Sequence, residues 1–287
     1  MDDGSKDDSF SIALKTIEGR GNCHLYRQKN AGVSMARNNG VALSQGEYLC
    51  FLDADDWWES TFLQEMDELI KEFPDAGIYG VNYTIVNETK HKTRVAKIGI
   101  EEGFEKGYIN YCKAYASTMY MPLISISVAI PRRVFEEAGG FRKGIKLGED
   151  FLLWIRIALT YKVAFLNKSL AYYNQDVDVA NRGTNHVHRP EENMLWNLGF
   201  LEEEEKTNKD YKQLVDNLRS FGLLPYYLEK RYRAAAQEEL DKVDWDRQPI
   251  SSKHLYQRPV WLIKMHYKLM KIGSWFKQRI IPINRGI

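Results

Sequence analysis

The sequence has few cysteines, no secretory leader and no long hydrophobic run. Its three cysteines, Cys23, Cys50 and Cys112, are odd in number and lack the spacing of a metal site, which predicts a reduced, cytoplasmic protein without structural zinc. No apolar run approaches the roughly 18–20 residues that a membrane-spanning helix requires. The first nine residues, MDDGSKDDS, are acidic and polar, which is unlike a secretory signal.

Hydrophobic and aromatic residues are present in ordinary amounts. They make up 44% and 13% of the 287 residues, enough for a sizeable core, so a disordered chain is excluded. The net charge of +1 conceals an asymmetry. Of 40 basic residues nine follow Asp246, which leaves 31 basic and 39 acidic residues up to that position, a net charge of −8. An acidic body with a basic tail suggests two separate roles.

Short apolar runs alternate with helical patterns over residues 1–185, which predicts a layered α/β domain. The predicted strands are 48–52, 76–83, 125–130, 162–166 and 171–173, the first of them buried on both faces. The predicted helices are 59–73, a short helix from Pro131 to Gly139-Gly140, and 151–160. A helical extension is expected over 186–250, with helices at 191–205 and 211–220.

Residues 251–287 form a basic segment of their own. Over 260–280, apolar residues recur every three or four positions while lysines fall on another face, which predicts an amphipathic helix. With Trp261 and Trp275 it suits peripheral contact with the inner face of the cell membrane. A helix packed on the α/β domain or on a second subunit is the alternative. No nucleic-acid-reading motif accompanies the charge, so a nucleic-acid partner is not expected.

Three acids directly follow the first predicted strand: Asp53, Asp55 and Asp56. Ligands of open α/β sheets bind beyond the carboxyl ends of strands, where these carboxylates are expected. Crowded acids repel one another, and a bound Mg²⁺ or Mn²⁺ with its preference for oxygen ligands would relieve that repulsion. Alternatively, Asp55 or Asp56 only caps the following helix.

A second candidate segment precedes this strand. Residues 28–40 lead into a helix whose predicted N-cap is Ser34, with Arg37 one turn further. A helix N-terminus with an arginine beside it suits a diphosphate. The alternative is a surface ion pair at Arg37.

These residues carry a family resemblance. Residues 30–56, NAGVSMARNNGVALSQGEYLCFLDADD, resemble the bacterial family 2 glycosyltransferases with the GT-A fold. Ser127–Asp150 is similar to the acceptor-side segment of that family, and Asp2-Asp3-Gly4-Ser5 is similar to the turn after its second strand. The resemblance covers most of residues 1–175 and implies a GT-A Rossmann-like sandwich with a mixed central sheet, followed by the helical extension.

The resemblance also implies roles for individual residues. Asp53 would contact the ribose or sugar, and Asp55, with Asp53, would hold Mn²⁺ or Mg²⁺ at the nucleotide diphosphate. Asp3 would hydrogen-bond the base, and Arg37 would stand near the diphosphate. Asp150 would be the general base that accepts a proton from the acceptor hydroxyl.

Glu149 and Asp150 are neighbours on the proposed acceptor side. Glu149 would shape the acceptor site. We expect the helix N-terminus at Asp150 to keep this carboxylate ionised.

The implied activity is an inverting, metal-dependent transfer of one sugar. The resemblance implies a nucleotide-diphosphate sugar as donor, with a UDP-sugar as the first expectation, and a glycan or a lipid-linked glycan as acceptor in cell-surface polysaccharide synthesis. A catalytically impaired binding or scaffold subunit remains the alternative. A sugar nucleotidyltransferase would need a glycine-rich, basic nucleotide loop at the N-terminus, which this sequence lacks.

The sequence departs from the family pattern at its start. Members begin with a strand, a helix and a second strand, a unit of about 30 residues, before the turn at which this sequence opens. Without that unit we expect a poorly stable or inactive polypeptide. His186 and His188 could supply a third metal ligand, although exposed loop histidines are the favoured interpretation. The tyrosines of 108–120 are expected to pack in the core rather than on sugar rings.

Overall fold

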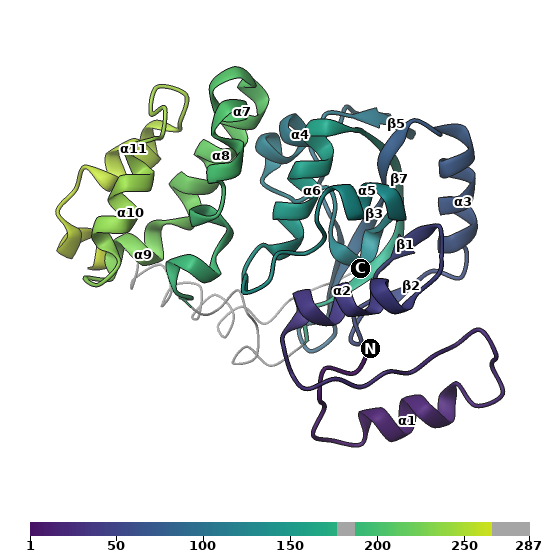
Figure 1. The fold of residues 1–287 in the computed structure, drawn as a ribbon. Coiled ribbons are helices and arrows are strands. Elements are labelled where there is room, and N and C mark those ends of the chain that lie inside the picture. The colour runs from purple at the N-terminus through teal and green to yellow at the C-terminus, as the bar shows by residue number, and fades with distance from the viewer. Residues whose placement is uncertain (177–186, 266–287) are drawn as a thin grey trace, which may run out of the picture. The chain divides into compact units, whose positions relative to one another are not determined.

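The computed structural model describes residues 1–176 and 187–265 (Figure 1). Internal contacts divide the chain into two compact units, Met1–Leu214 and Val215–Ile287. The sequence predicted boundaries near residues 185 and 250, so the first unit extends further than residue 185. Each unit is described by itself.

The first unit contains one seven-stranded mixed sheet with helices around it. In chain order its regular elements are α1 (Ser9–Thr16), α2 (Val33–Leu43), β1 (Tyr48–Cys50), β2 (Trp57–Trp58), α3 (Phe62–Glu72), β3 (Ala76–Asn87), β4 (Lys92–Val95), β5 (Lys106–Ile109), α4 (Tyr111–Thr118), β6 (Val128–Pro131), α5 (Arg132–Glu137), α6 (Glu149–Thr160) and β7 (Lys162–Asn174). Their alternation confirms the α/β class.

The two longest strands, β3 and β7, form the centre of the sheet. They run parallel, and the path through the sheet is β1-β6-β3-β7-β2, with β4 added to β3 and β5 to β7. Nearly all of β3 is buried. Helices α3 and α6 both pack against β3 and β7, and the apolar face of α3 explains why it folds there, since Phe62, Met66 and Leu69 are buried.

Most predicted elements of this unit are present, with three corrections. In the predicted strand 125–130, Ser125–Ser127 form a 3₁₀ turn, and only the part from Val128 on belongs to a strand, β6. The run Tyr48–Leu52 was expected to be buried on both faces, but β1 is an edge strand that pairs with β6 alone among the described strands. Tyr48 is therefore exposed and Cys50 only half-buried. The two strands predicted at 162–166 and 171–173 are one strand, β7, because local register shifts against β3 absorb the polar residues between them.

The segment after residue 186 differs most from expectation. No α-helix covers 191–205; the chain forms three short 3₁₀ turns, Pro190–Glu192, Met194–Trp196 and Gly199–Leu201, before α7 (Glu202–Thr207). Asn193 accounts for part of this, because its buried side chain accepts a hydrogen bond from the Leu195 amide and competes with helix formation. Helix α8 (Lys209–Gly222) confirms the prediction for 211–220.

The second unit is helical. It contains the end of α8 and α9 (Leu224–Leu228), α10 (Arg233–Leu240) and α11 (Ile250–Tyr256). The buried Arg219 forms an ion pair with the buried Glu239 at 3.1 Å, so the two charges compensate each other. Residues 260–265 are helical as predicted, whereas the rest of the predicted 260–280 helix lies outside the described residues. In the described part of the chain, no helix has the length and apolarity needed to cross a membrane.

The N-terminal residues contact α2 and the segment before it. Asp2 forms an isolated parallel bridge with Arg27, and its carboxylate pairs with the Arg27 guanidinium at 2.9 Å. The opening turn is thereby held beside residues 26–28. This contact positions Asp3, the predicted base-binding residue.

The packing of β3 predicts a steric limit at Gly80. A Cβ atom added there would overlap a methyl group of the fully buried Leu123 and lie 3.2 Å from the Phe165 ring. We expect Gly80→Ala to lower the free energy of unfolding by about 1–3 kcal/mol, measured by urea denaturation. Gly21→Ala is the matched control, since open space surrounds a Cβ at Gly21. Equal stability of the two variants would contradict this packing.

Candidate functional site

The guanidinium of Arg37 joins three separate segments of the first unit. Its Nη2 donates to both carboxylate oxygens of Asp53, at 2.8 and 2.9 Å, and its Nη1 donates to Glu149 Oε1 at 3.2 Å. Arg37 lies on α2, Asp53 follows β1, and Glu149 begins α6. Asp53 and Glu149, which lie 16 and 112 positions after Arg37 in the sequence, thus meet at its side chain. The sequence prediction selected all three residues, and the structure brings them together.

Arg37 is buried, and its charge is balanced. Its side chain is only 10% exposed and lies over the Phe141 ring, 5.2 Å from the ring centroid. Burial acts to lower the pKa of Arg37, but the charges of Asp53 and Glu149 outweigh it, so the pKa lies above its ordinary value. The guanidinium therefore stays charged, and its hydrogen bonds hold two acids in place. Whether it also stands near a diphosphate stays a prediction.

Asp3 binds the chain just before α2. Its Oδ1 accepts hydrogen bonds from the Gln28 side chain (2.7 Å) and the Ala31 amide (2.8 Å), and its Oδ2 accepts one from the Gly32 amide (2.9 Å). The N-cap of α2 is Gly32, not Ser34 as predicted. A φ of 88° at Gly32, which favours glycine, turns the chain into the helix. The carboxylate of Asp3 thus binds two amides of the chain that leads into α2.

The three acids after β1 have different surroundings. Asp53 pairs with Arg37, and Asp56 accepts a hydrogen bond from the Asn174 amide at 2.7 Å. Burial, with further contributions from the charges of Asp55 and Asp53, raises the pKa of Asp56 to about 7. Asp55 is exposed, and its carboxylate has no hydrogen-bond or ion-pair partner among the described residues. Asp55 is therefore the acid that remains available to an external ligand.

This set of acids fits a divalent cation held partly by other ligands. Among the described residues, no group of three or more His, Cys, Asp or Glu side chains could hold a metal ion alone. Mg²⁺ and Mn²⁺, however, bind commonly through one or two carboxylates together with waters and phosphate oxygens. Asp55 offers a free carboxylate, and Asp53 lies two residues before it. The donor set fits such an ion in a ternary complex with a diphosphate.

Asp150 lies beside Glu149 in the first turn of α6. Its Oδ1 accepts a hydrogen bond from the Phe151 amide at 2.7 Å. Its carboxyl group is enclosed by protein, although the residue as a whole is half-buried. Burial raises the pKa of Asp150 to about 7, and Glu149 adds to the effect, while Arg37 and the Phe151 amide oppose it. The expectation that the helix N-terminus keeps Asp150 fully ionised is wrong, because loss of hydration outweighs the helix dipole here.

Tyrosines border the Asp150 carboxyl group. Tyr111 and Tyr115 are buried on α4, as the core-packing interpretation predicted, and Tyr115 packs edge-on against Phe151, with ring centroids 6.0 Å apart. Tyr83 on β3 is also buried, and its hydroxyl donates to the Met121 carbonyl at 3.1 Å. Burial raises the pKa of each of these three phenols, so they stay neutral. Asp150 thus lies in a weakly polar environment.

Comparison with known proteins finds a family that the N-terminal part of the chain matches. Residues 1–134 match the family model described as Glycosyl transferase family 2, and these residues include Asp3, Arg37, Asp53 and Asp55. This match and the relatives below support a family 2 glycosyltransferase. Glu149 and Asp150 lie beyond the matched residues.

Two pneumococcal glycosyltransferases are among its relatives. Glycosyltransferase GlyA of Streptococcus pneumoniae serotype 4 is 33% identical over 180 residues, which are 60% of this chain and 25% of GlyA. Glycosyltransferase GlyG of the same organism is 23% identical over 212 residues, 70% of this chain and 66% of GlyG. The chain thus spans about a quarter of the length of GlyA and just under two thirds of that of GlyG.

A solved structure supports the fold. The structure of Staphylococcus aureus TarS residues 1–349 in complex with UDP-GlcNAc matches with a TM-score of 0.64 at 16% identity, over 86% of this chain and 70% of that one. The likeness confirms the expected GT-A architecture.

The family 2 motif contains one structural residue that sequence reasoning left without a role. Asn38, next to Arg37, donates to the Phe141 carbonyl at 2.7 Å and accepts from the Phe141 amide at 3.0 Å. This pair of hydrogen bonds ties α2 to the loop between α5 and α6, and Phe141 in turn packs under Arg37. The Ala-Arg-Asn string of the sequence includes Asn38, but its hydrogen-bond partner Phe141 lies 103 positions away and could not be predicted from the string.

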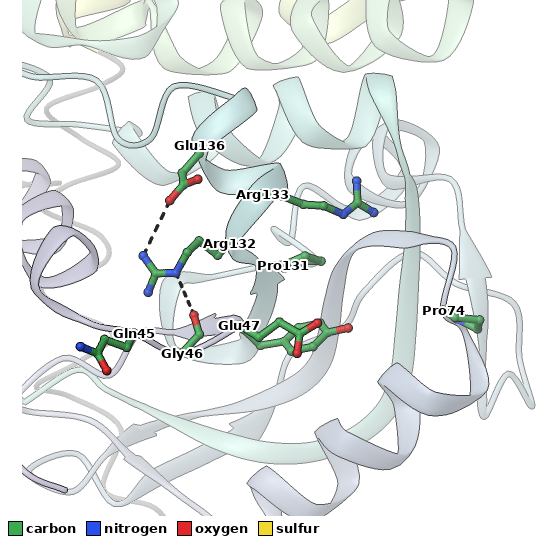
Figure 2. Close-up of a pocket in the computed structure, with 9 residues that line it drawn as sticks. Gln45, Gly46, Glu47, Pro74, Pro131, Arg132, Arg133 and Glu136 are labelled. Atoms are coloured by element: carbon green, nitrogen blue, oxygen red, sulfur yellow. Dashed lines mark hydrogen bonds and ion pairs between the residues drawn. The ribbon is translucent and has the colours of Figure 1, made fainter.

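Two other features lie apart from these acids. His188 is half-buried, and His186 lies outside the described residues, so its predicted role as a metal ligand stays a prediction. A pocket of about 300 Å³ lies where β1 begins and β6 ends, and contains none of the predicted site residues (Figure 2). There Arg132 donates to the Gly46 carbonyl at 2.8 Å and lies 3.8 Å from Glu136. The acids follow the opposite end of β1.

The environment of Asp150 predicts an abnormal titration. We expect its carboxyl carbon to titrate with a pKa of about 7 in the folded protein, against an ordinary value of 3.8. Because the folded pKa is raised, this group should make the fold less stable as pH rises from about 4 to about 7. Replacement of its charged neighbour, Glu149→Gln, should lower the pKa of Asp150, measured by ¹³C NMR of aspartate-labelled protein.

Asp150→Asn would assign the signal, and Glu136→Gln on α5 is the matched control that should leave it unchanged. An Asp150 signal that titrates near 4 would contradict this account.

Proposed function

We propose that this protein transfers one sugar, with inversion, from a nucleotide-diphosphate sugar to a hydroxyl of a glycan or a lipid-linked glycan. The observation that carries the proposal is the meeting of Asp53 and Glu149 at Arg37, because it sets the acids after β1 near the first turn of α6. The donor-side acids and Asp150 thereby border one site. The match of residues 1–134 to glycosyltransferase family 2 supports glycosyl transfer as its reaction.

The donor is a nucleotide sugar, and a uridine nucleotide is the first to test. The structurally similar TarS domain was solved with UDP-GlcNAc, which supports this class of ligand. In the proposed complex the nucleobase contacts Asp3 and residues 28–32, which Asp3 holds in place through hydrogen bonds. Asp53 lies at the ribose or sugar. Arg37 orients the Asp53 carboxylate through two hydrogen bonds.

Asp55, with Asp53, would hold a Mn²⁺ or Mg²⁺ ion. When bound, such an ion neutralises the negative charge that develops on the departing diphosphate. The exposed, unpartnered carboxylate of Asp55 supports this role. Asp53 keeps its hydrogen bonds to Arg37, which limit its freedom to rotate.

Asp150 acts as the general base. In the proposed step the acceptor oxygen forms a bond to the anomeric carbon, the bond from that carbon to the phosphate oxygen breaks, and the hydroxyl proton passes to the Asp150 carboxylate. A base with a pKa of about 7 is well matched to this transfer near neutral pH. Glu149 helps to raise that pKa and also pairs with Arg37, so it couples the two sides of the site.

The proposed setting is the cytoplasmic face of the cell membrane, where cell-surface polysaccharides are assembled. Trp261 is 67% exposed and Met265 48% exposed, with Lys264 exposed between them. An exposed aromatic beside cations suits an anionic lipid surface. This supports the peripheral contact predicted from the sequence.

Removal of the free carboxylate tests the metal role. Asp55→Asn in the full chain should abolish the Mn²⁺-dependent part of sugar transfer from a panel of nucleotide sugars, and should weaken Mn²⁺ binding measured by calorimetry with uridine diphosphate present. Asp67→Asn, an exposed acid on α3, is the control. Unchanged Mn²⁺ dependence in Asp55→Asn would remove Asp55 from the proposal.

Removal of the base should separate binding from chemistry. Asp150→Asn should bind the donor normally but lower the transfer rate by about 100- to 10,000-fold. In the unmodified protein the rate should rise with pH to a plateau above a midpoint of about 7, because only the ionised carboxylate accepts the proton. An unaltered rate in Asp150→Asn, or donor binding with no transfer by the unmodified chain, would contradict the proposal; the latter would favour a binding subunit.

A further inference from the structure

The β3–β4 hairpin carries four cations without acidic partners. Lys90, Lys92, Arg94 and Lys97 are all exposed, and no carboxylate among the described residues forms an ion pair with any of them. Other lysines of the same unit, such as Lys106, do have ion-pair partners. The four lie within residues 90–97, the last of them two residues after β4, in a chain that is acidic overall up to Asp246. Unpaired cations in an acidic body attract an external anion.

The strand register places two of these cations on one face of the sheet. Arg94 is paired with Ile85 and Lys92 with Asn87, and directly paired residues point to the same face. Along β3 that face also includes Tyr83, two residues before Ile85. Thr84 and Val86 point to the opposite face. Lys92, Arg94 and Tyr83 therefore share one surface of this end of the sheet.

Asp150 lies within electrostatic range of Tyr83 on this face. The neighbours that affect the Tyr83 phenol electrostatically include Asp150, Tyr173 and Tyr120. Tyr173 on β7 is paired with Ile85 on β3, so the strand register independently places Tyr173 on the same face. It is 37% exposed. A partly exposed tyrosine thus accompanies the cations near the proposed base.

Arg94 is oriented by an aromatic contact. Its guanidinium carbon lies 5.6 Å from the centre of the Tyr120 ring. Stacking restricts the side chain while its N–H donors remain free of carboxylates. The planar array of donors in a guanidinium matches the two oxygens of a carboxylate or a phosphate. Arg94 is therefore suited to bind an anion in a defined orientation.

The hairpin itself is held in shape. The Asp176 carboxylate accepts hydrogen bonds from the backbone amides of Glu88 and Thr89, the latter at 3.1 Å, and Asn87 accepts one from the Lys90 amide at 2.9 Å. The Asp176 carboxylate is thus engaged with the turn. A preorganised hairpin reduces the entropy lost when a ligand binds.

We infer that the Lys92–Arg94 face of the hairpin binds an acceptor glycan that carries negative charge, as carboxylate or phosphate, and so delivers its hydroxyl to Asp150. The inference rests on the proposed function and names the acceptor class for that same site. Tyr173 and Tyr120 supply apolar surface for sugar rings between the charged contacts.

Binding of defined oligomers tests the inference without requiring catalysis. Calorimetry on the full chain would compare an oligogalacturonate, a glycerol-phosphate oligomer and a neutral maltooligosaccharide of equal length, with and without uridine diphosphate. We expect at least one anionic oligomer to bind, more weakly at high salt, and the neutral one not to bind. Lys92→Gln/Arg94→Gln should weaken binding by about fivefold or more.

The control Lys15→Gln/Lys71→Gln removes two charges from exposed positions on α1 and α3 and should bind as the unmodified protein does. Thermal melts would establish that both double variants are folded. Donor binding should be equal in all three proteins, so loss of donor binding or transfer in the unmodified chain counts against the proposed function and not against the hairpin.

Three results with the oligomers would overturn the inference. They are equal binding of neutral and anionic oligomers, no binding of any oligomer, and unchanged affinity in Lys92→Gln/Arg94→Gln. Binding of anionic phospholipid vesicles that depends on Lys92 and Arg94, without oligomer binding, would also overturn it and assign the hairpin to a membrane.

Discussion

The structure of the site depends on one buried cation, Arg37, shared between two acids. Its guanidinium binds both oxygens of Asp53 and one oxygen of Glu149, so the segment after β1 and the first turn of α6 cannot separate without leaving a buried charge unpaired. Such a loss is costly, because few waters can replace the missing partner. The same constraint sets the position of Asp150, which follows Glu149 in the chain.

The acids around this pair differ in how the protein engages them. Asp3 and Asp53 are occupied by hydrogen bonds from the protein, whereas Asp55 is free. Asp150 lies in a weakly polar environment that raises its pKa to about 7 and leaves it able to exchange a proton near neutrality. Cations without acidic partners among the described residues occur on the β3–β4 hairpin, where we propose that an acceptor binds. Opposite charges are thus kept in different parts of the proposed site.

Sequence reasoning recovered elements with strong local patterns. The amphipathic helix α3 and the short helix α5 after Pro131 are where the pattern predicted them. It failed where distant residues decide the outcome. A continuous apolar run did not reveal that β1 is an edge strand. Helix periodicity over 191–205 did not reveal that Asn193 uses its side chain to form a turn. The ionisation of Asp150 was misjudged because a helix N-terminus is a local feature, whereas burial is not.

By itself the sequence determined the α/β class, the family resemblance and the set of acids proposed to carry the chemistry, because these follow from residue order and local spacing. Only the tertiary structure decided that Arg37 binds Asp53 and Glu149 together, that Asn38 holds Phe141, and that Lys92 and Arg94 share a face with Tyr83. Those outcomes depend on strand register and on contacts between segments up to 112 residues apart. Hydrophobic periodicity and motif spacing carry no information at that range, since it is packing that selects the partners.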